Sequence, residues 1–147
     1  MVGLPGDRVQ MRQGQLFINN HAASMRADGV GEAEDDHGFT EKANRYIETL
    51  PNGVEHLIYK IRDNGRLDNR PEVAVPPGML FVLGDNRDNS ADCRVAVRDG
   101  GVGLLPIDNL IGRADAVVGS WDMGMRSQPV WTWLAGLRLE RIFTSVH

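Results

Sequence analysis

Turn-forming residues divide this chain into short apolar segments, and this division constrains the fold more than any other feature. The 147 residues include 17 Gly and 7 Pro. Asn52-Gly53 separates two runs of strand character, 45–50 and 54–61, which is a strong local signal for a β-hairpin. Gln13-Gly14 separates another pair of segments, in which apolar residues alternate. The pattern predicts an all-β fold built from short antiparallel strands.

An apolar run from Met79 to Leu83 leads into the most polar loop of the chain. The run follows Pro76-Pro77-Gly78, and because it is short, apolar and bounded by turn formers, we expect a buried β-strand. Eight of the ten residues after Gly84 are polar or charged. A loop delivered by a strand is a common place for a functional site, because the sheet holds it in position.

The loop of residues 84–94 contains three aspartates and two arginines. Buried carboxylates need partners, and the planar guanidinium group of arginine fits them. One interpretation is a polar turn that satisfies its own charges. A calcium loop is a second interpretation, but its spacing is wrong: Arg87 stands at the third position, Ser90 where glycine is required, and Ala96 where a bidentate Glu belongs.

The remaining segments carry weaker signals. Residues 4–7 predict a tight turn, and the Gly- and acid-rich stretch 22–44 predicts a solvated loop. Residues 72–75 lead toward the strand before the polar loop, and 106–109 predict a turn or a short helix. Residues 110–120 predict a core strand. Residues 130–146 fit either a strand or a short helix followed by a strand.

Composition limits the possible functions. The length suggests one domain with a sizeable core. The chain has a net charge of −4 and therefore lacks the excess of basic residues that is typical of a nucleic-acid-binding protein. Its single cysteine rules out an internal disulfide, and its four histidines show no metal-ligand spacing. No apolar run is long enough to cross a bilayer, and no N-terminal signal pattern is present.

The polar loop resembles the last signature box of bacterial type I signal peptidases, the S26-type Ser/Lys peptidases. Its sequence is Gly-Asp-Asn-Arg-Asp-Asn-Ser-Ala-Asp-Cys-Arg, where the family box usually ends in Ser-Arg. The preceding family box is similar to Gly-Leu-Pro-Gly-Asp at 3–7. Further similarity at 50–53, 109–114 and 136–139 extends the resemblance along the whole chain, in the family's order.

This resemblance implies a fold and a division of the chain. In the family, two packed antiparallel sheets form the catalytic core, and a β-rich insertion lies between the last two boxes. Residues 1–12 and 73–147 would belong to the core, and residues 13–72 would form the insertion within the same compact unit.

The resemblance also implies an activity. Signal peptidases are serine endopeptidases of the cytoplasmic membrane, and they remove signal peptides from secreted preproteins at its outer face. They use a Ser/Lys dyad, in which the lysine must be neutral to accept the serine proton. Burial favours the neutral amine by lowering its pKa. The substrate binds as an extended strand. No cofactor is implied.

Neither member of the dyad is expected in this chain. Aligned on Leu-Pro-Gly-Asp, the family lysine would stand two residues before Met1, and the nucleophilic serine further upstream. Ser24-Met25 is a false match to the serine box, because it follows residues 3–7 and lacks the Pro-Thr, so we expect Ser24 in a turn or loop. The chain thus resembles the C-terminal part of the catalytic domain, truncated just after the lysine and inactive alone.

The family's supporting roles can be carried over residue by residue. Ser90 would hydrogen-bond and orient the absent lysine, and Gly84 would leave room beside it. Ion pairs that hold the loop would involve Asp85, Asp92 and Arg94, with Arg87 and Asp88 sharing this scaffolding role. Cys93, in place of the usual serine, is interpreted as a small buried residue, since nothing marks it as a thiolate.

Two further hypotheses stay open at the level of sequence. One is a non-catalytic relative or fragment that acts as a binding or folding module. The other is an SOS-repressor-type autoprotease, which shares the fold and dyad but fits the box at 84–94 less well.

Two tryptophans raise the question of membrane contact. Trp131 and Trp133 precede Gly-Leu-Arg-Leu at 136–139, where signal peptidases often carry a tryptophan. Packing in the core is one interpretation. The other is contact with a membrane surface, because tryptophan prefers the boundary between lipid and water.

Overall fold

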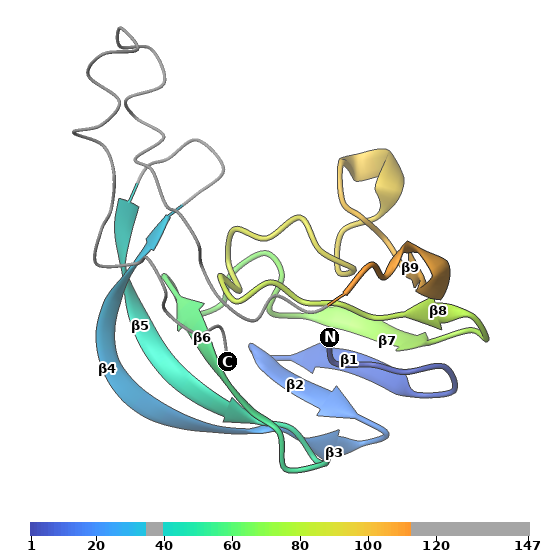
Figure 1. Cartoon of the computed structure of the whole chain (residues 1–147). Helices are drawn as coiled ribbons and strands as arrows, with labels where there is room; N and C mark the ends of the chain where they lie inside the picture. Colours follow the sequence, from blue (N-terminus) through green and yellow to red (C-terminus); the bar gives the residue numbers. More distant parts are fainter. Residues whose placement is uncertain (35–39, 113–147) are drawn as a thin grey trace, which may run out of the picture. The chain divides into compact units, whose positions relative to one another are not determined.

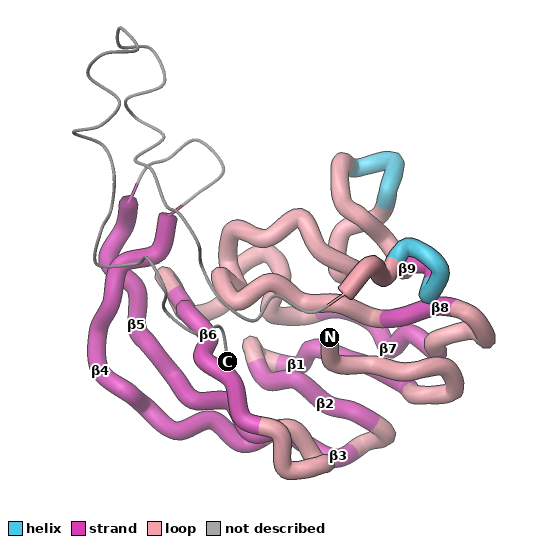
Figure 2. The backbone as a smooth tube through the Cα atoms, in the orientation of Figure 1, coloured by secondary structure: helices cyan, strands magenta, loops and turns pink. Residues whose placement is uncertain are grey.

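The computed structural model describes residues 1–34 and 40–112, of which Met1–Leu110 form one compact unit. Strands dominate this part of the chain (Figures 1 and 2), where the only helical segments are the short 3-10 turns η1 (Val97–Asp99) and η2 (Ile107–Asn109). The predicted all-β fold of short antiparallel strands is confirmed.

The first sheet has the strand order β3-β2-β1-β7. It consists of β1 (Arg8–Arg12), β2 (Gln15–Ile18), β3 (His21–Ala22) and β7 (Arg70–Ala74). Gln13 and Gly14 join β1 to β2 with φ angles of 49° and 77°. Positive φ at both central residues is the type I′ geometry that matches strand twist, which confirms the predicted hairpin.

The second sheet has the order β4-β5-β6, and all its pairs are antiparallel. Its strands are β4 (Ser24–Glu34), β5 (Thr40–Thr49) and β6 (Glu55–Lys60). The turn between β5 and β6 closes through a hydrogen bond of 2.8 Å from Gly53 N to Leu50 O, with Gly53 at φ 85°. The hairpin predicted around Asn52-Gly53 is confirmed.

The prediction of a solvated loop over residues 22–44 is wrong. Strands β4 and β5 occupy most of this stretch and pair from Ser24–Thr49 to Glu34–Thr40. Ser24 is accordingly an exposed strand residue and not a turn or loop serine. Most side chains of β4 are exposed, so its composition is that of a loop, while its backbone is paired along β5.

The hydrophobic core gathers residues from the first sheet and from the segments on either side of it. Alternate residues of β1 and β2 are buried, as the sequence pattern predicts. The core cluster consists of Val2, Val9, Met11, Leu16, Ile18, Ala23, Leu50, Val75 and Phe81. The core therefore includes residues from both predicted segments of the chain. The boundaries at 12/13 and 72/73 remain a prediction, although β2 and β3 pair within the sheet of β1 and β7.

The strand expected over residues 79–83 is shorter than predicted. Only Met79–Leu80 form a strand, β8, which pairs with β9 (Leu105–Pro106). Phe81 continues the pairing through a single bridge to Gly3. Residues 82 and 83 are half-buried and outside any strand, because the partner segments on both sides are too short to extend the ladder.

The C-terminal expectations lie largely outside the described residues. η2 confirms the turn or short helix expected at 106–109. Of the core strand expected over 110–120, only 110–112 are described. They form no strand, and Leu110 and Ile111 are exposed. The segment 130–146, with Trp131 and Trp133, is outside the described residues.

A buried ion pair joins the second sheet to the β1–β2 turn. Lys60 Nζ at the end of β6 donates to Asp68 Oδ1 at 2.8 Å, and both side chains are buried. The backbone of Asp68 in turn accepts a hydrogen bond of 2.9 Å from Gly14 N. A Cβ atom at Gly14 would lie 2.6 Å from Lys60 Nζ, so this turn needs glycine for both its φ angle and its close approach to the amine.

We expect Asp68→Ala to lower the free energy of unfolding by about 3–5 kcal/mol, because it leaves the Lys60 ammonium buried without its partner. Asp99→Ala is the matched control, since the Arg98–Asp99 pair is exposed and worth about 0–1 kcal/mol. Urea denaturation of the two variants measures both changes. Equal, small losses would show that Lys60 reaches water.

Candidate functional site

The two sequence boxes meet at one place in the fold. Gly3 and Phe81 exchange backbone hydrogen bonds, with 3.1 Å from Gly3 N to Phe81 O and 2.9 Å from Phe81 N to Gly3 O. Phe81 lies three residues before Gly84, where the polar loop begins. We call residues 84–94 the box loop. The segment before the Leu-Pro-Gly-Asp turn is thus fixed beside the entry to the box loop.

Gly84 and Ser90 face each other across the box loop. A Cβ atom on Gly84 would lie 2.2 Å from Ser90 Oγ and 2.5 Å from Ser90 Cβ. These distances are too short for any other residue at position 84 unless the loop moves. The structure therefore brings together the two residues that the family resemblance singled out around the lysine, and Gly84 makes space for the Ser90 hydroxyl itself.

Asp92 and Arg94 form a buried pair at the base of the loop. Asp92 Oδ1 accepts from Arg94 Nε at 2.9 Å and Asp92 Oδ2 from Arg94 Nη2 at 2.7 Å, a bidentate arrangement. Asp92 Oδ2 also accepts from Gly84 N at 3.0 Å, which closes the loop. Burial alone would raise the pKa of Asp92, but the hydrogen bond and charge of Arg94 outweigh it and lower that pKa.

Asp85 does not take part in this pairing. Its side chain is exposed, and its Oδ1 accepts a local hydrogen bond of 2.9 Å from Asn86 N. Within residues 1–34 and 40–112 it forms no ion pair, contrary to the expectation for this position. Asp92, two residues before Arg94, takes the Nε and Nη2 donors of its guanidinium group, whereas the exposed Asp85 side chain bonds locally to Asn86 N.

Cys93, near the end of the box loop, is half-buried. Its Sγ accepts a hydrogen bond of 3.0 Å from Val82 N, and burial raises the pKa of the thiol. The neutral thiol is therefore the form that this site favours. On sequence grounds Cys93 is interpreted as a small buried residue, and the structure shows it half-buried.

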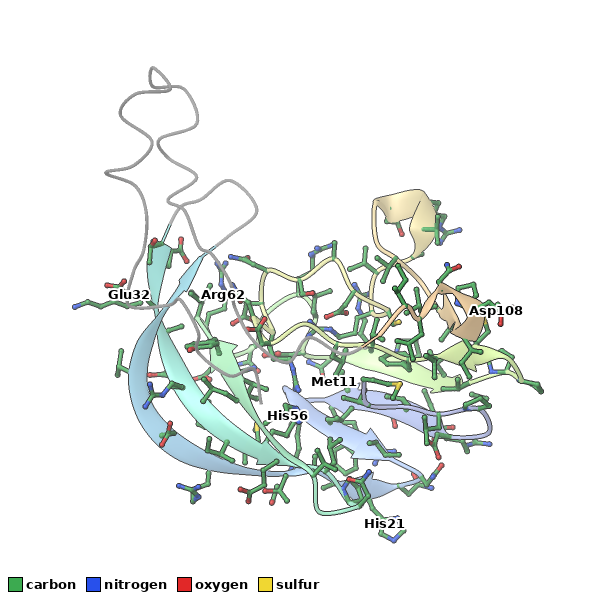
Figure 3. The ribbon with its side chains drawn as sticks, in the orientation of Figure 1. Met11, His21, Glu32, His56, Arg62 and Asp108 are labelled. Carbon is green, nitrogen blue, oxygen red and sulfur yellow. The ribbon has the colours of Figure 1, made fainter. Side chains whose placement is uncertain are left out.

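The side chain of Arg87 extends from the box loop and binds a carboxylate of the second sheet. Its Nη1 donates to Glu48 Oε1 at 2.8 Å, and its Nη2 contacts Glu48 Oε2. Arg87 is 1% exposed and Glu48 is fully buried. His56 on β6, labelled in Figure 3, completes the cluster. Its Nε2 lies 2.9 Å from Glu48 Oε2. Burial alone would raise the pKa of Glu48, but the bonds and charges of His56 and Arg87 lower it to about 2.

The same sheet also holds the loop through its backbone. Tyr59 N donates to Asp85 O at 2.9 Å and Tyr59 O accepts from Arg87 N at 3.0 Å, so the loop adds to β6 as a short parallel bridge. Asp88 Oδ2 accepts from Ile61 N at 2.7 Å and from Arg62 N at 3.0 Å. Asp88 therefore has a positioning role through the backbone of the two residues that directly follow β6.

Sequence reasoning missed Glu48 and His56. Glu48 follows Ile47 in a run of mixed polarity, and a charged residue in such a run normally faces solvent. His56 had no apparent partner, because Glu48 and Arg87 come close to it only through the sheet pairing and the loop. No local signal in the sequence identifies this cluster.

Two functional features are absent from the described part of the chain. Across residues 1–34 and 40–112, no group of three or more His, Cys, Asp or Glu side chains is arranged to hold a metal ion. The same residues contain no helix that is long and apolar enough to span a membrane.

We expect folding to lose stability in acid partly through Glu48. Because the pKa of Glu48 is lowered from 4.5 to about 2 on folding, its contribution is complete above pH 4.5 and disappears as pH falls toward 2. Its size is roughly 3 kcal/mol. Denaturant titrations between pH 2 and 6 should therefore show a shallower acid loss for Glu48→Gln than for wild type.

Glu32→Gln, on the exposed face of β4, is the control and should keep the wild-type pH profile. Identical profiles for wild type and Glu48→Gln would contradict the buried pairing of Glu48 with Arg87.

Comparison with known proteins agrees with the arrangement of the two boxes. The family model described as "Signal peptidase, peptidase S26" matches residues 1–121. Signal peptidase I of Rickettsia akari (strain Hartford) and that of Rickettsia typhi (strain ATCC VR-144 / Wilmington) are each 32% identical over 165 aligned residues. Signal peptidase I of Rickettsia conorii (strain ATCC VR-613 / Malish 7) is 30% identical.

These alignments cover 100% of this chain and 58% of each relative, so the chain spans little more than half of their length. No solved structure is a significant match to it. The family model covers most of the chain, including both boxes and the Gly3–Phe81 contact between them, and the chain therefore belongs to the peptidase S26 family of signal peptidases.

Proposed function

We propose that this chain is part of the catalytic domain of a signal peptidase, a serine endopeptidase that removes signal peptides from secreted preproteins. The observation that carries the proposal is the pairing of Gly3 with Phe81, beside the loop where Ser90 faces Gly84. A dyad base supplied from upstream of Met1 would enter the fold next to these residues.

The register of this pairing supports the position of the base. Because Gly3 and Phe81 are antiparallel partners, residues that precede Gly3 run alongside the residues that follow Phe81. A lysine two positions before Met1 would then be level with the start of the box loop, close to Gly84 and Asp85. We assign to Ser90 the role of orienting its amine, which is that of a positioning residue.

The box loop supplies rigidity for this arrangement. Its Ser90 side is held by Asp92 and Arg94, and its outer side by Arg87 and Asp88, which bind the second sheet. Well-fixed supporting groups keep a catalytic lysine in its productive geometry. A non-catalytic binding module would not need so close a contact between Gly84 and Ser90, and the peptidase is therefore the better interpretation.

A groove beside the N-terminal segment suits the apolar part of a peptide substrate. It has a volume of about 510 Å³ and is lined by Met1, Val2, Leu4, Ile18 and Leu50, together with polar residues at its rim. Its size and apolar walls are typical of a ligand site. We assign to it the residues of the preprotein that flank the cleavage site.

Membrane contact is a separate part of the proposal. A signal peptide reaches its peptidase at the surface of the cytoplasmic membrane, so the catalytic domain has to work close to lipid. The amphipathic rings of Trp131 and Trp133 suit the lipid–water boundary, and the positive charges of Arg138 and Arg141, which follow them in the sequence, suit anionic headgroups.

We expect a version of the chain extended upstream, carrying the Lys-Arg and serine boxes, to cleave a preprotein reporter. In this version Ser90→Ala should lower kcat roughly tenfold, the effect of losing one hydrogen bond to the lysine. It should also shift the pH–rate profile toward higher pH. The neutral lysine amine loses its hydrogen bond to Ser90, so the pKa of the lysine rises. The folded-state CD spectrum should not change.

The control in this experiment is Ser24→Ala, which should retain full activity because Ser24 is an exposed residue of β4. The 147-residue chain itself should release no product. Cleavage by that chain, abolished by Ser24→Ala, would overturn the proposal and identify Ser24 as the nucleophile.

We expect weak binding of the chain to vesicles of phosphatidylethanolamine and phosphatidylglycerol. Trp131→Ala/Trp133→Ala should reduce co-sedimentation, and Trp121→Ala is the matched control that should leave it unchanged. The tryptophan emission of wild type should move to shorter wavelength on binding. Equal sedimentation of all three proteins would assign Trp131 and Trp133 to the core.

A further inference from the structure

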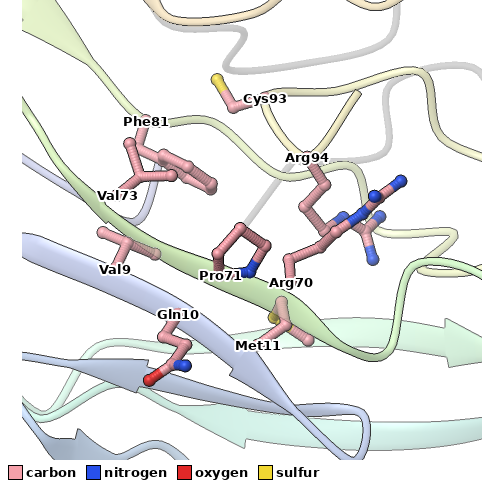
Figure 4. Close-up of a pocket in the computed structure, with 9 residues that line it drawn as sticks. All are labelled: Val9, Gln10, Met11, Arg70, Pro71, Val73, Phe81, Cys93 and Arg94. Carbon is pink, nitrogen blue, oxygen red and sulfur yellow. The ribbon is translucent and has the colours of Figure 1, made fainter. Parts of the chain in front are cut away.

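A second pocket lies between β1, β7 and the end of the box loop (Figure 4). Its volume is about 130 Å³, and its apolar wall is formed by Val9, Met11, Val73 and Phe81. Arg70 of β7 and Arg94 of the box loop line it as well, and Figure 4 shows both guanidinium groups extending toward the same side of the pocket. Neither Ser90 nor Gly84 is among its described lining residues.

Both arginines carry a buried N–H group without a partner. Arg70 Nε and Arg94 Nη1 are inaccessible to water and form no hydrogen bond in the part of the chain that the structure describes. The Arg94 side chain is 0% exposed. A buried donor left unpaired costs free energy, so an acceptor that entered the pocket and bonded to these two donors would remove that cost. Arg87 Nε and Asp88 Oδ1 are also buried without a partner among the described residues, but neither residue lines this pocket.

The charges around the pocket do not balance. The charge of Arg94 is neutralised by Asp92, which accepts hydrogen bonds from it with both carboxylate oxygens. Arg70 forms no ion pair within residues 1–34 and 40–112, and its Nε has no hydrogen-bond partner there. The pocket therefore carries about one uncompensated positive charge in surroundings that are partly shielded from water.

We propose that this pocket is a carboxylate site, in which Arg70 and Arg94 hold the two oxygens and the apolar wall holds a short alkyl chain. A carboxylate carries one negative charge, which matches the single excess charge, and its planar geometry fits guanidinium donors. A phosphate dianion would leave one negative charge unbalanced against apolar residues. By comparison with a 150 Å³ cavity that admits benzene, the volume suits a ligand of about six heavy atoms.

The ligand is thus a small aliphatic carboxylic acid or the side chain of an acidic residue. This site goes beyond the proposed peptidase function, because it is built from Arg70 and the outer side of Arg94. It needs neither the nucleophile nor the lysine, so its test is independent of whether the chain belongs to an active peptidase.

The test uses the chain itself and sodium butyrate, which has six heavy atoms, at an ionic strength held constant with sodium chloride. Heteronuclear NMR follows the side-chain Nε–H signals of the arginines. We expect the Arg70 signal to shift saturably, with half-saturation at about 1–10 mM, as fits a ligand of this size. Butyramide, which has the same shape and no charge, should cause no saturable shift.

Arg70→Gln should weaken butyrate binding at least tenfold, whereas Arg98→Gln, at an exposed arginine of η1, should leave it unchanged. The backbone amide spectrum of each variant verifies its fold, and the wild-type titration decides the question even if Arg70→Gln fails to fold. A second pair of ligands, acetyl-Ala-Glu-Ala-amide and its Gln counterpart, tests a peptide as the source of the carboxylate.

Saturable binding of butyrate identifies a free acid as a sufficient ligand, and binding of the Glu peptide without butyrate binding identifies an acidic residue of a polypeptide. Either result supports the carboxylate site. Equal responses to butyrate and butyramide, equal responses of wild type and Arg70→Gln, or a shift that follows ionic strength alone would overturn it.

Discussion

The buried ion pair between Arg87 and Glu48 is the interaction on which the rest of this structure depends. It joins the box loop to the middle of the second sheet, although the two residues are 39 positions apart in the chain. Charges so deeply buried cost several kcal/mol each unless they are paired, and the bidentate geometry with His56 alongside meets that cost. The loop and the sheet are therefore stable in this form only together.

The box loop divides its polar residues between two tasks. Asp92 and Arg94 close the loop on itself and hold Gly84 against Ser90. Arg87 binds Glu48 of β5, and Asp88 binds the backbone of Ile61 directly after β6. This division explains why a loop so rich in Asp and Asn does not behave as a solvated turn: nearly every charge has a fixed partner, and Asp85 is the exposed exception.

Strands β5 and β6 are consequently part of the site's support and not a passive addition to it. Strand β6 bonds to the backbone of the box loop through Tyr59, and β5 contributes Glu48. The N-terminal segment reaches the same loop from the first sheet through Gly3 and Phe81. In the proposed peptidase, these connections would keep the lysine and Ser90 in register.

Local sequence signals determined the features that local physics controls. Gln13-Gly14 and Asn52-Gly53 predicted their hairpins correctly, because a two-residue or glycine-containing turn depends on φ preferences within a few residues. The contiguous box at 84–94 was enough to indicate the family, since it specifies a chemistry by residue type and spacing alone. The ion pair of Asp92 with Arg94 was likewise within reach, because its members are two residues apart.

Only the tertiary structure decided the features that depend on distant neighbours. Residues 24–34 have the composition of a loop, and they form a strand because β5 offers a backbone to pair with, which composition does not record. From the sequence, Glu48 is expected at the surface, but in the structure it is buried because Arg87 of the box loop pairs with it. Arg70 and Arg94 form one pocket for the same reason. A chain specifies its turns through neighbouring dihedral angles, but the partner of a buried charge depends on which segments the whole fold brings together.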